Sequence, residues 1–520
     1  MKLSVIGTGY VGAVHAACMA VIGHEVLGVD TDAAKIAELT QGRPPFYEPG
    51  LAELLNRTVR SGRLNFTTSF AEAAAFSDTH FVCVGTPQQP GSLAADLRFL
   101  DAAVDALTAE AEGPCLVVGK STVPVGTAER LANRLRDRDG NGAHEHPEIA
   151  WNPEFLREGF AVKDTLTPAR LVVGVRSPSA DRTLRKVYRP MVNAGVPFIS
   201  TDPATAELLK VASNAFLATK ISFINTMAEL CEASGADVVT LANALGEDPR
   251  IGHPFLSAGL GFGGSCLPKD IRALSARAEE LGVREAVTFL RQIDEINLRQ
   301  RQRTVDLART LLGGAFAGRN VAVLGAAFKP DSDDVRDSPA LAVAAEIHRE
   351  GAHVRVHDPE ALANARLVHP ELDYAATVHD VCDGADIVLH LTEWDLYRGL
   401  DPRTLVRLVH APIVVDARNT LDPVEWRAAG WTVRALGRQA ALGTPDAHGT
   451  AAEPEVSGNP AFRIAATGLD DDDGDFGPFG FRHTGPQLVA EIEPGAYRTG
   501  RPDAAVPDDR RQPPIAPSEY

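Results

Sequence analysis

KLSVIGTGYVG, residues 2–12, runs from a short apolar segment through a glycine-rich turn into a helical pattern. In that setting a G-x-G-x-x-G motif predicts a dinucleotide-binding turn. Gly7 permits the tight turn, Gly9 lets the backbone approach a pyrophosphate, and Gly12 lets the helix pack closely against the strand. Asp30 ends the next strand-like run, 18 residues beyond Gly12, where a carboxylate binds the adenosine ribose and disfavours a 2′-phosphate. These residues predict a Rossmann-like domain that binds NAD.

Strand-like and helical patterns alternate from this turn to about residue 202, which predicts a parallel sheet with helices on both faces. The strand-like runs are residues 2–6, 25–30, 80–84, 115–120 and 149–152. Helical patterns cover 203–234 and 284–312, and strand-like runs restart at 320–325, 353–357, 386–391 and 412–416. We predict an α/β fold with two Rossmann-like, doubly wound parallel-sheet domains, residues 1–202 and 315–444, joined by a central helical domain, residues 203–314.

The composition changes after about residue 444. Residues 445–520 are rich in Pro, Gly, Asp and Glu with little periodicity, which predicts a disordered acidic tail. The acidic run at 470–475 does not fit a calcium-binding loop, because Leu469 and Gly480 would take the first and last ligand positions. We therefore predict a solvated acidic tract and no metal site.

The overall composition excludes several classes of partner. A formal net charge of −18 argues against nucleic acid or an anionic membrane, because both attract basic surfaces. The first residues predict no export signal, and no apolar run approaches the ~20 residues of a membrane span. Six cysteines lie far apart without a C-x-x-C pair, which suits a reducing cytoplasm and predicts neither a disulfide framework nor a zinc site. An acidic chain that binds nucleotides must concentrate its cations inside clefts.

A second glycine-rich stretch, GFGGSCLPKD at residues 261–270, presents Cys266 beside Lys269 and Asp270. Glycines let a substrate approach the backbone, and a neighbouring cation or helix N-terminus lowers the pKa of a thiol. The pattern favours a nucleophilic cysteine, with Lys269 or the following helix as the source of positive charge. The alternative is a small buried hydrophobic residue, the commoner role of an unpaired cysteine.

Polar residues in three other segments favour the catalytic interpretation. KSTVPVGT at 120–127 and NPEFLREG at 152–159 follow strand-like runs, where open α/β sheets bind their ligands. Lys210 and Asn214 lie four residues apart and share one face of the predicted long helix. A buried lysine there can stabilise a developing oxyanion, with Asn214 as a second donor, whereas the alternative is a lysine that reaches solvent.

Together these segments resemble the UDP-glucose/GDP-mannose dehydrogenase family over about residues 1–440. The matching stretches are 7–12, 47–51 (YEPGL), 84–87 (VGTP), 121–127, 152–159, 210–216, 250–270 and 328–339 (FKPDSDDVRDSP). The stretches 250–252 and 329–339 are more similar to the branch that oxidises UDP-glucose. Leu267, directly after the cysteine, also suits the GDP-mannose branch, so GDP-mannose is the alternative substrate.

The resemblance implies a four-electron oxidation of a nucleotide sugar at C6, with two NAD molecules used in turn. Cys266 is implied to attack the intermediate aldehyde, giving a thiohemiacetal and then a thioester that water hydrolyses. Lys210 and Asn214 are implied to stabilise charge on the C6 oxygen, and Asp270 to assist proton transfers at the thioester. Glu154 and Thr122 are implied to position a water in the proton relay, and the identity of the principal base stays open.

The resemblance also implies the ligand contacts. The cofactor set is Gly7, Gly9, Tyr10, Val11, Gly12, Asp30, Thr86, Thr122, Glu158, Lys269 and Arg336, with Lys35 either beside the adenosine or solvated. The substrate set is Glu154, Phe155, Leu156, Arg157, Glu158, Lys210, Asn214, Phe255, Leu256, Ser257, Ala258, Gly259, Gly263 and Lys329. Arg250 is implied to reach the sugar from a neighbouring subunit, in a homodimer built through the long central helix.

Two other classes of protein share part of this pattern. A 6-phosphogluconate-type or hydroxyacid dehydrogenase joins a Rossmann domain to a helical domain with a lysine, but needs neither the thiol nor a second α/β domain. An NAD-sensing regulatory protein would keep the fold and lose the chemistry. Intact Cys266, Lys210, Asn214 and Asp270 argue against such a sensor.

Overall fold

The computed structural model describes residues 1–139 and 147–438. The tail predicted for residues 445–520, with its acidic tract, lies outside the described residues. Among the described helices, none combines the length and the apolar character that a membrane span requires.

The N-terminal sheet has the order β3-β2-β1-β4-β5-β6-β7-β8. Its strands are β1 (Lys2–Ile6), β2 (Glu25–Val29), β3 (Leu64–Thr67), β4 (Thr79–Val82), β5 (Leu116–Gly119), β6 (Glu148–Trp151), β7 (Leu171–Gly174) and β8 (Phe198–Thr201). All neighbouring strands pair in parallel except β6 and β7, which pair antiparallel where Trp151 faces Gly174. The strand order reverses between β1 and β4, the place where an open α/β sheet binds its ligand.

Helices cover both faces of this sheet. They are α1 (Tyr10–Val21), α2 (Ala33–Thr40), α3 (Leu51–Arg60), α4 (Phe70–Phe76), α5 (Arg98–Glu110), α6 (Thr127–Asp139), α7 (Ala161–Leu166), α8 (Pro178–Val187) and α9 (Arg189–Asn193). One apolar core joins the sheet to α1, α3, α7 and α8, and a second joins it to α5 and α6. Two cores on one sheet are the mark of a doubly wound domain.

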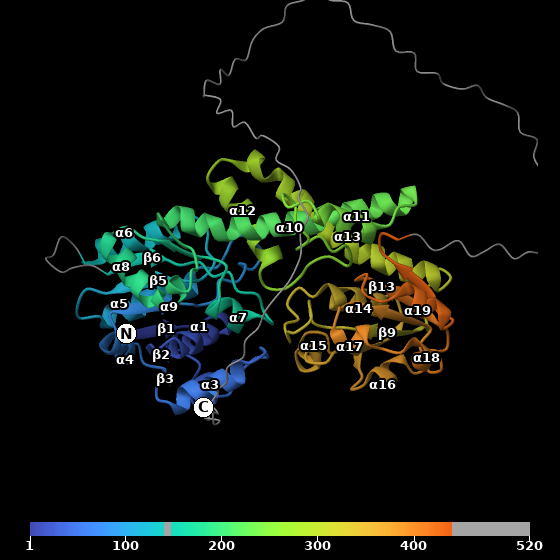
Figure 1. Cartoon of the computed structure of the whole chain (residues 1–520), viewed down its shortest axis with the longest axis horizontal. Helices are drawn as coiled ribbons and strands as arrows, with labels where there is room; N and C mark the ends of the chain where they lie inside the picture. Colours follow the sequence, from blue (N-terminus) through green and yellow to red (C-terminus); the bar gives the residue numbers. More distant parts are fainter. Residues whose placement is uncertain (140–146, 439–520) are drawn as a thin grey trace, which may run out of the picture. The chain divides into compact units, whose positions relative to one another are not determined.

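The centre of the chain is helical. It contains α10 (Pro203–Ser234), α11 (Val238–Gly246), α12 (Leu267–Glu280), the short 3₁₀ helix η1 (Arg284–Val287) and α13 (Thr288–Leu311). Asp202 caps the start of α10 by accepting from the Thr205 amide, Pro203 fits its first turn, and Gly235 ends it in the left-handed conformation at φ 82°. The long helix packs against α12 and α13, as Figure 1 shows. It therefore carries its side chains beside the segment that contains Cys266.

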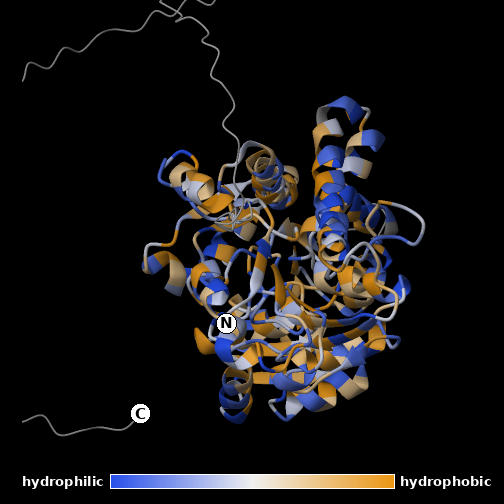
Figure 2. Cartoon of the chain, turned by 90° about the vertical axis from the view of Figure 1, so that its right-hand side faces the viewer, coloured by the Kyte–Doolittle hydropathy of each residue, from blue (hydrophilic) through white to orange (hydrophobic). Residues whose placement is uncertain are grey.

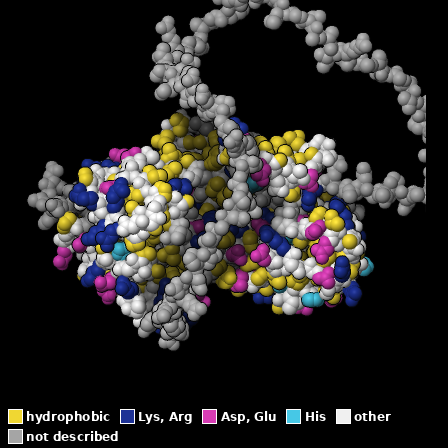
Figure 3. Space-filling view, viewed as in Figure 1, with side chains coloured by type: hydrophobic (Ala, Val, Ile, Leu, Met, Phe, Trp, Pro, Cys, Tyr) yellow, Lys and Arg dark blue, Asp and Glu magenta, His cyan; other side chains and the backbone are white. Residues whose placement is uncertain are grey.

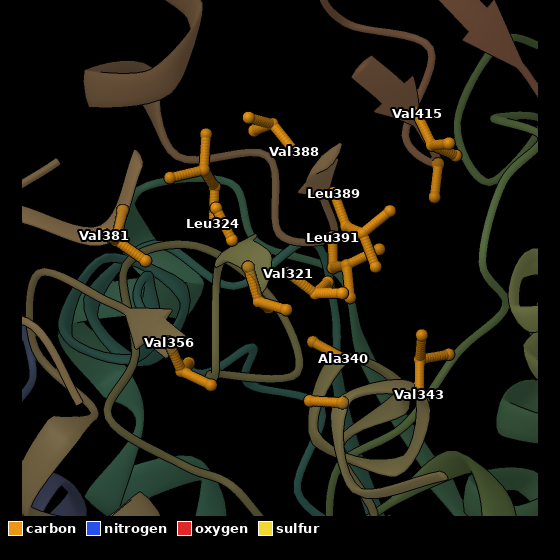
Figure 4. Close-up of a cluster of buried hydrophobic side chains, with 14 of the residues drawn as sticks. Val321, Leu324, Ala340, Val343, Val356, Val381, Val388, Leu389, Leu391 and Val415 are labelled. Carbon is orange, nitrogen blue, oxygen red and sulfur yellow. The ribbon is translucent and has the colours of Figure 1, made fainter. Parts of the chain in front are cut away.

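The second sheet has the order β11-β10-β9-β12-β13-β14, and every neighbouring pair is parallel. Its strands are β9 (Asn320–Leu324), β10 (His353–His357), β11 (Asp373–Tyr374), β12 (Ile387–His390), β13 (Ile413–Asp416) and β14 (Thr432–Ala435). The helices are α14 (Pro339–Arg349), α15 (Leu362–Val368), α16 (Val378–Cys382), α17 (Asp395–Arg398), α18 (Pro402–Leu405) and α19 (Pro423–Ala428). Val321, Leu389 and Ala340 belong to the core between sheet and helices (Figure 4).

The predicted fold class is confirmed by these two doubly wound domains and the helical region between them. Figure 2 shows that the helices carry both hydrophilic and hydrophobic stretches, as expected where each helix has one face on a sheet. Lysine and arginine side chains are interspersed with aspartate and glutamate on the face seen in Figure 3.

Candidate active site

The first glycine-rich turn has the geometry that a bound pyrophosphate requires. Gly7 has φ +86°, and a Cβ at Gly12 would lie 1.8 Å from the Gly7 carbonyl oxygen. In contrast, a Cβ at Gly9 would meet nothing within 4 Å. Gly9 is the residue directly before α1, and no side chain caps the first amides of that helix. The turn is therefore tight on its protein side and open at Gly9, where the amides at the start of α1 can face an anion.

Asp30 follows β2 and points into the same turn. Its Oδ2 accepts hydrogen bonds from the Thr8 amide at 2.9 Å and the Lys35 ammonium at 3.0 Å. Burial raises the pKa of this carboxyl, but the Asp32 amide, Lys35 and Thr8 outweigh it and hold the pKa below its ordinary value. Asp30 is thus ionised at neutral pH, and Lys35 lies beside it at the predicted ribose position.

The second glycine-rich stretch is anchored by a buried asparagine of α13. The Asn297 side chain accepts from the Phe262 amide at 2.7 Å and donates to the Phe262 carbonyl at 2.9 Å. Gly261 has φ +95°, and a Cβ there would lie 2.5 Å from Asn297 Oδ1. This anchoring fixes the turn that leads to Cys266, the residue directly before α12.

Cys266 as a whole residue is exposed, so it is not the small core residue of the alternative interpretation, although protein atoms surround its sulfur. Burial of its surroundings raises the pKa of this thiol, the Asp270 carboxylate raises it further, and the Lys210 ammonium only partly opposes them. Lys269 lies 3.3 Å from Asp270 Oδ1 and donates to the Thr86 carbonyl at 3.4 Å. The expectation that Lys269 or the start of α12 lowers this pKa is therefore wrong. A base must take the thiol proton when the sulfur reacts.

Lys210 and Asn214 share the inner face of α10, as their spacing predicted. Lys210 is 5 % exposed, which excludes a lysine that reaches solvent. Its ammonium lies 3.9 Å from Glu154 Oε2 and 5.5 Å from the centre of the Phe155 ring. Asn214 donates to the buried Asp270 Oδ2 at 2.6 Å. A cation, an amide donor and two carboxylates thus meet beside the segment that carries Cys266.

Two glutamates of the 152–159 segment have pKa values suited to proton transfer. Burial raises the pKa of Glu154 to about 7, although Lys210 and Lys120 oppose it. Burial and then the Asp334 carboxylate raise the pKa of Glu158 to about 7, against Lys329 and Arg336. A carboxyl group with a pKa near 7 can accept and return a proton at neutral pH.

Glu158 also joins this segment to the 328–339 stretch. Its carbonyl accepts from the Lys329 ammonium at 2.6 Å, and its carboxylate lies 3.6 Å from the Arg336 guanidinium. The Ser265 and Ser332 hydroxyls each lie 3.4 Å from the same carboxylate. Two cationic side chains that the sequence predicted to bind ligands, Lys329 and Arg336, therefore lie in the neighbourhood of Cys266.

The loop predicted to line the sugar is held against the second sheet domain. The Gly259 amide donates to the buried Asn225 side chain at 2.8 Å, and a Cβ on Gly259 would lie 2.4 Å from the Ala417 carbonyl oxygen. Phe255 takes the left-handed conformation at φ 67°, and a Cβ on Gly263 would lie 2.3 Å from the Asp337 carbonyl oxygen. Leu256 and Ala258 are buried, whereas Ser257 is exposed.

Three further predicted residues have partners elsewhere in the chain. The Arg157 guanidinium pairs with Asp164 at 2.8 Å. Arg250 pairs with Asp248, and its side chain is 87 % exposed. The Thr122 carbonyl accepts from the Thr86 hydroxyl at 2.7 Å, which links two predicted cofactor residues.

The chain matches three domain descriptions of one enzyme family in sequence order. Residues 1–192 match the NAD binding domain of the UDP-glucose/GDP-mannose dehydrogenase family, residues 204–299 its central domain, and residues 322–423 its UDP binding domain. The chain belongs to this family. The glycine-rich turn, the cysteine loop and the 328–339 stretch each fall within one of the three matched regions.

Similar proteins cover the same part of the chain. The UDP-glucose 6-dehydrogenase of Rhizobium meliloti is 42% identical over 442 residues, which are 84% of this chain and 100% of that protein. The UDP-glucose 6-dehydrogenase of Pseudomonas aeruginosa is 40% identical over 84% of this chain and 98% of its own length. A UDP-glucose dehydrogenase structure from Pyrobaculum islandicum has a TM-score of 0.77 at 40% identity and covers 84% of this chain and 98% of that one.

NAD is the cofactor of the matched N-terminal domain, and the geometry of this chain fits it. The open approach at Gly9, the amides that begin α1 and the ionised Asp30 after β2 are the groups that a pyrophosphate and an adenosine ribose need. The family's cofactor site therefore has its donors and acceptors in place here.

Substitution of two glycines should separate folding from cofactor binding. Gly9→Ala adds a methyl group where the protein leaves space, so we expect unchanged thermal unfolding and NAD affinity weakened about ten- to a hundred-fold, from about 1–3 kcal/mol of overpacking against the ligand. Gly12→Ala forces a Cβ to within 1.8 Å of a carbonyl oxygen and should lower the unfolding temperature markedly. Calorimetric NAD titration and thermal melts measure both effects. Equal NAD affinity in Gly9→Ala and the unaltered chain would contradict this assignment of the turn.

Two buried glutamates that sequence reasoning did not assign hold the site segments in place. Glu48, in the YEPGL stretch, accepts from the Gly159 amide at 2.7 Å and the Ala161 amide at 2.6 Å. Glu207 accepts from the Gly126 amide at 2.7 Å and the Ala128 amide at 2.6 Å, which fixes the turn after Thr122. The available signal was the position of Glu207, three residues before Lys210 on the same helix face.

Proposed function

We propose that this protein oxidises UDP-glucose to UDP-glucuronate in two NAD-dependent steps, with Cys266 as the nucleophile. The observation that carries the proposal is the exposed residue Cys266 in the segment beside the buried Lys210, Asn214 and Asp270. Relatives about 40% identical over almost their full length bear the name UDP-glucose 6-dehydrogenase, which supports this substrate over GDP-mannose.

In the first oxidation the C6 hydroxyl oxygen loses its proton and the C6 carbon loses a hydride, which gives the aldehyde. NAD, when bound, accepts the hydride in each of the two oxidations. Lys210 and Asn214 hold the C6 oxygen and stabilise its developing negative charge, because an ammonium and an amide donor in a buried site interact strongly with an oxyanion. Glu154 receives the hydroxyl proton, directly or through a water held with Thr122.

In the second half of the reaction the thiol attacks the aldehyde. A bond forms between Sγ of Cys266 and C6 as the C6–O π bond breaks toward the oxygen, where Lys210 and Asn214 stabilise the charge. The thiol proton passes to a carboxylate, because the raised pKa keeps the resting thiol protonated. Oxidation of the thiohemiacetal gives a thioester. Asp270 then assists a water that attacks C6, the C–S bond breaks, and the sulfur regains a proton as the acid leaves.

Cations on the 261–270 and 328–339 stretches place the anionic ligands. We propose that Lys329 binds the diphosphate of the substrate and that Lys269 and Arg336 contact NAD. Phe155, Leu156, Arg157 and the loop from Phe255 to Gly259, with Gly263, line the substrate. This arrangement explains how a chain with a net charge of −18 accepts two anionic ligands.

One assay tests the proposed function. The purified chain is mixed with NAD and UDP-glucose, GDP-mannose or a hydroxyacid, and the NADH formed per molecule of sugar is counted. Two NADH per UDP-glucose are expected. Two NADH per GDP-mannose with none from UDP-glucose would show that GDP-mannose is the substrate instead. No NADH from any of the three would indicate a regulatory protein that senses NAD.

The dependence of turnover on pH should reveal the base. Glu154 must be ionised to accept a proton, so kcat should fall as the pH drops below about 7 and level off above it. Glu154→Gln should abolish this fall of kcat at low pH, the acidic limb of the profile, together with most of the activity. Glu158→Gln should keep the acidic limb. If the limb vanishes only in Glu158→Gln, the two glutamates exchange roles. Steady-state rates over a pH series in one constant-ionic-strength buffer measure the effect.

We propose that α10 forms a homodimer with a second copy of the chain. Phe216, Phe223 and Leu230 recur along this helix at about seven-residue spacing and are 65%, 48% and 56% exposed. A row of large exposed apolar side chains marks a protein interface, and a two-fold axis would let each copy cover the row of the other. Such a dimer would also bring the exposed Arg250 of one copy to the sugar bound by its partner.

Charge on this row should break the dimer. Phe216→Asp combined with Phe223→Asp should give a monomer in light scattering and reduce turnover, because each site loses the partner's arginine. The control is Leu367→Asp, a comparably exposed apolar residue on α15, which should leave the dimer intact. A dimer that survives the double substitution would contradict this interface.

We further propose that the reaction takes place in the cytoplasm. All six cysteines are unpaired, as in a reducing compartment, and Cys266 must stay reduced to act. Fractionation of the native cells with an antibody to this chain tests the location.

A further inference from the structure

A cavity lies between the 152–159 segment and α1. It has a volume of about 210 Å³ and is lined at its buried end by His15, Lys120, Asn152 and Tyr188. Glu154 also lines it, whereas Cys266, Asp270 and Thr122 do not. The cavity reaches exposed residues at Arg157 and Ala169. Phe155, Leu156 and Arg157 line it as well, so the cavity connects Glu154 with solvent beside the segment that we propose to hold the substrate, at a place that the thiol does not line.

Unpaired polar atoms face this cavity. His15 is 1 % exposed, and in the described part of the chain neither of its ring nitrogens has a hydrogen-bond partner. Oε1 of Glu154 is likewise buried without a partner among the described residues. Buried polar groups are almost always paired with protein or with water, and a cavity of this size with polar walls holds water. These atoms point to an ordered water chain.

The rest of the inner wall is a fixed polar network. Lys120 donates to Asn152 Oδ1 at 3.0 Å, Tyr188 donates to the same oxygen at 2.6 Å, and the Asn152 amide donates to the Val172 carbonyl at 2.7 Å. The charged groups that act on Glu154 are Lys210, Lys120, Asp164 and Asp270, and those that act on His15 are Lys120 and His24. Burial, then Lys120 and His24, keep the pKa of His15 well below its ordinary value. A neutral imidazole can accept a hydrogen bond at one nitrogen and donate at the other.

We propose that this cavity is a proton exit, in which water molecules anchored by His15 carry the proton received by Glu154 to solvent between Arg157 and Ala169. The inference rests on the proposed function. Each oxidation moves a hydride to NAD and a proton to a base, and hydrolysis of the thioester releases the proton of the acid. Glu154 is 11 % exposed, so it needs a route by which to lose each proton before the next step.

Two substitutions interrupt the route at opposite ends. His15→Phe keeps the ring that packs 4.6 Å from Phe81 but makes the inner wall apolar, and apolar cavities stay dry. Ala169→Trp fills the mouth from an exposed position, so it tests the route even if His15→Phe does not fold. Ala194→Trp, at an exposed alanine outside the cavity, is the matched control.

Stopped-flow mixing of the full chain with NAD and UDP-glucose in weak buffer follows NADH by absorbance and protons in solution by an indicator dye. In the unaltered chain and in Ala194→Trp, protons should appear in step with NADH. In His15→Phe and Ala169→Trp, protons should lag behind NADH and kcat should fall about ten-fold, less than the loss of a direct acid–base group. Protons in step with NADH in both variants would overturn the exit, whereas an unaltered chain that makes no NADH would overturn the proposed function instead.

Discussion

Cys266→Ser should reduce steady-state turnover of UDP-glucose by at least about 10⁴-fold, as loss of a catalytic nucleophile does in other enzymes. A serine hydroxyl at this exposed position has nearly the same shape as the thiol, so both ligands should still bind. The first oxidation does not involve the sulfur. The variant should therefore form about one NADH per active site and then stall, because no thioester can form. Rapid-quench analysis counts NADH per site in the first turnover.

The matched control for this substitution is Cys115→Ser. Cys115 is half-buried and unpaired, and it lies in the N-terminal domain before β5. Its substitution should leave kcat within about two-fold, as expected for a change away from the reacting atoms. Full turnover by Cys266→Ser would refute the nucleophile assignment, and equal losses in the two variants would show a general effect on the fold.

Elements with a strong local pattern could be predicted from the sequence. The predicted ranges 2–6, 353–357 and 203–234 coincide with β1, β10 and α10, because each combines an apolar pattern with a breaker or cap at its ends. The strands that the sequence did not predict include β3 and β8, which lie at the edges of the first sheet. The four residues of β8 are all partly or fully exposed, so no alternation of apolar and polar residues marks the strand.

The shared face of Lys210 and Asn214 was predictable from the sequence, whereas the electrostatics around Cys266 were not. Spacing alone put Lys210 and Asn214 on one face of a helix, and both are buried there. Burial is the main cause of the raised pKa of Cys266, and the Asp270 carboxylate raises it further. The Lys269 ammonium instead donates to the Thr86 carbonyl. Sequence adjacency to a lysine therefore predicted the wrong sign.

Hydrogen-bond partners that are distant in the sequence could not be inferred from the sequence either. Glu48 bonds an amide 111 residues away, and Glu207 bonds one 81 residues away. Each glutamate stands in an ordinary helical or loop pattern that is equally typical of a solvated carboxylate. Only the packed structure shows that they fix the turns that carry Glu158 and Thr122.

Lys210→Ala should slow both oxidations by about 10²- to 10³-fold, the cost of losing one strong donor to a developing oxyanion. The ammonium acts on the C6 oxygen in each step, so no intermediate should accumulate, in contrast to Cys266→Ser. Its removal also leaves Glu154 without the cation 3.9 Å away that lowers the pKa of that carboxyl. The acidic limb of kcat should therefore move to higher pH, from its position near 7.

Two measurements separate this catalytic role from a structural one. Lys186→Ala, at an exposed lysine of α8, is the matched control and should change neither kcat nor the pH profile. Thermal unfolding shows whether the fold survives. We expect that it does, because without the Lys210 cation Glu154 can take a proton rather than remain an uncompensated buried charge. A Lys210→Ala protein that raises KM alone, with kcat and the acidic limb unchanged, would show that the ammonium binds the sugar equally in ground and transition states and takes no part in the chemistry.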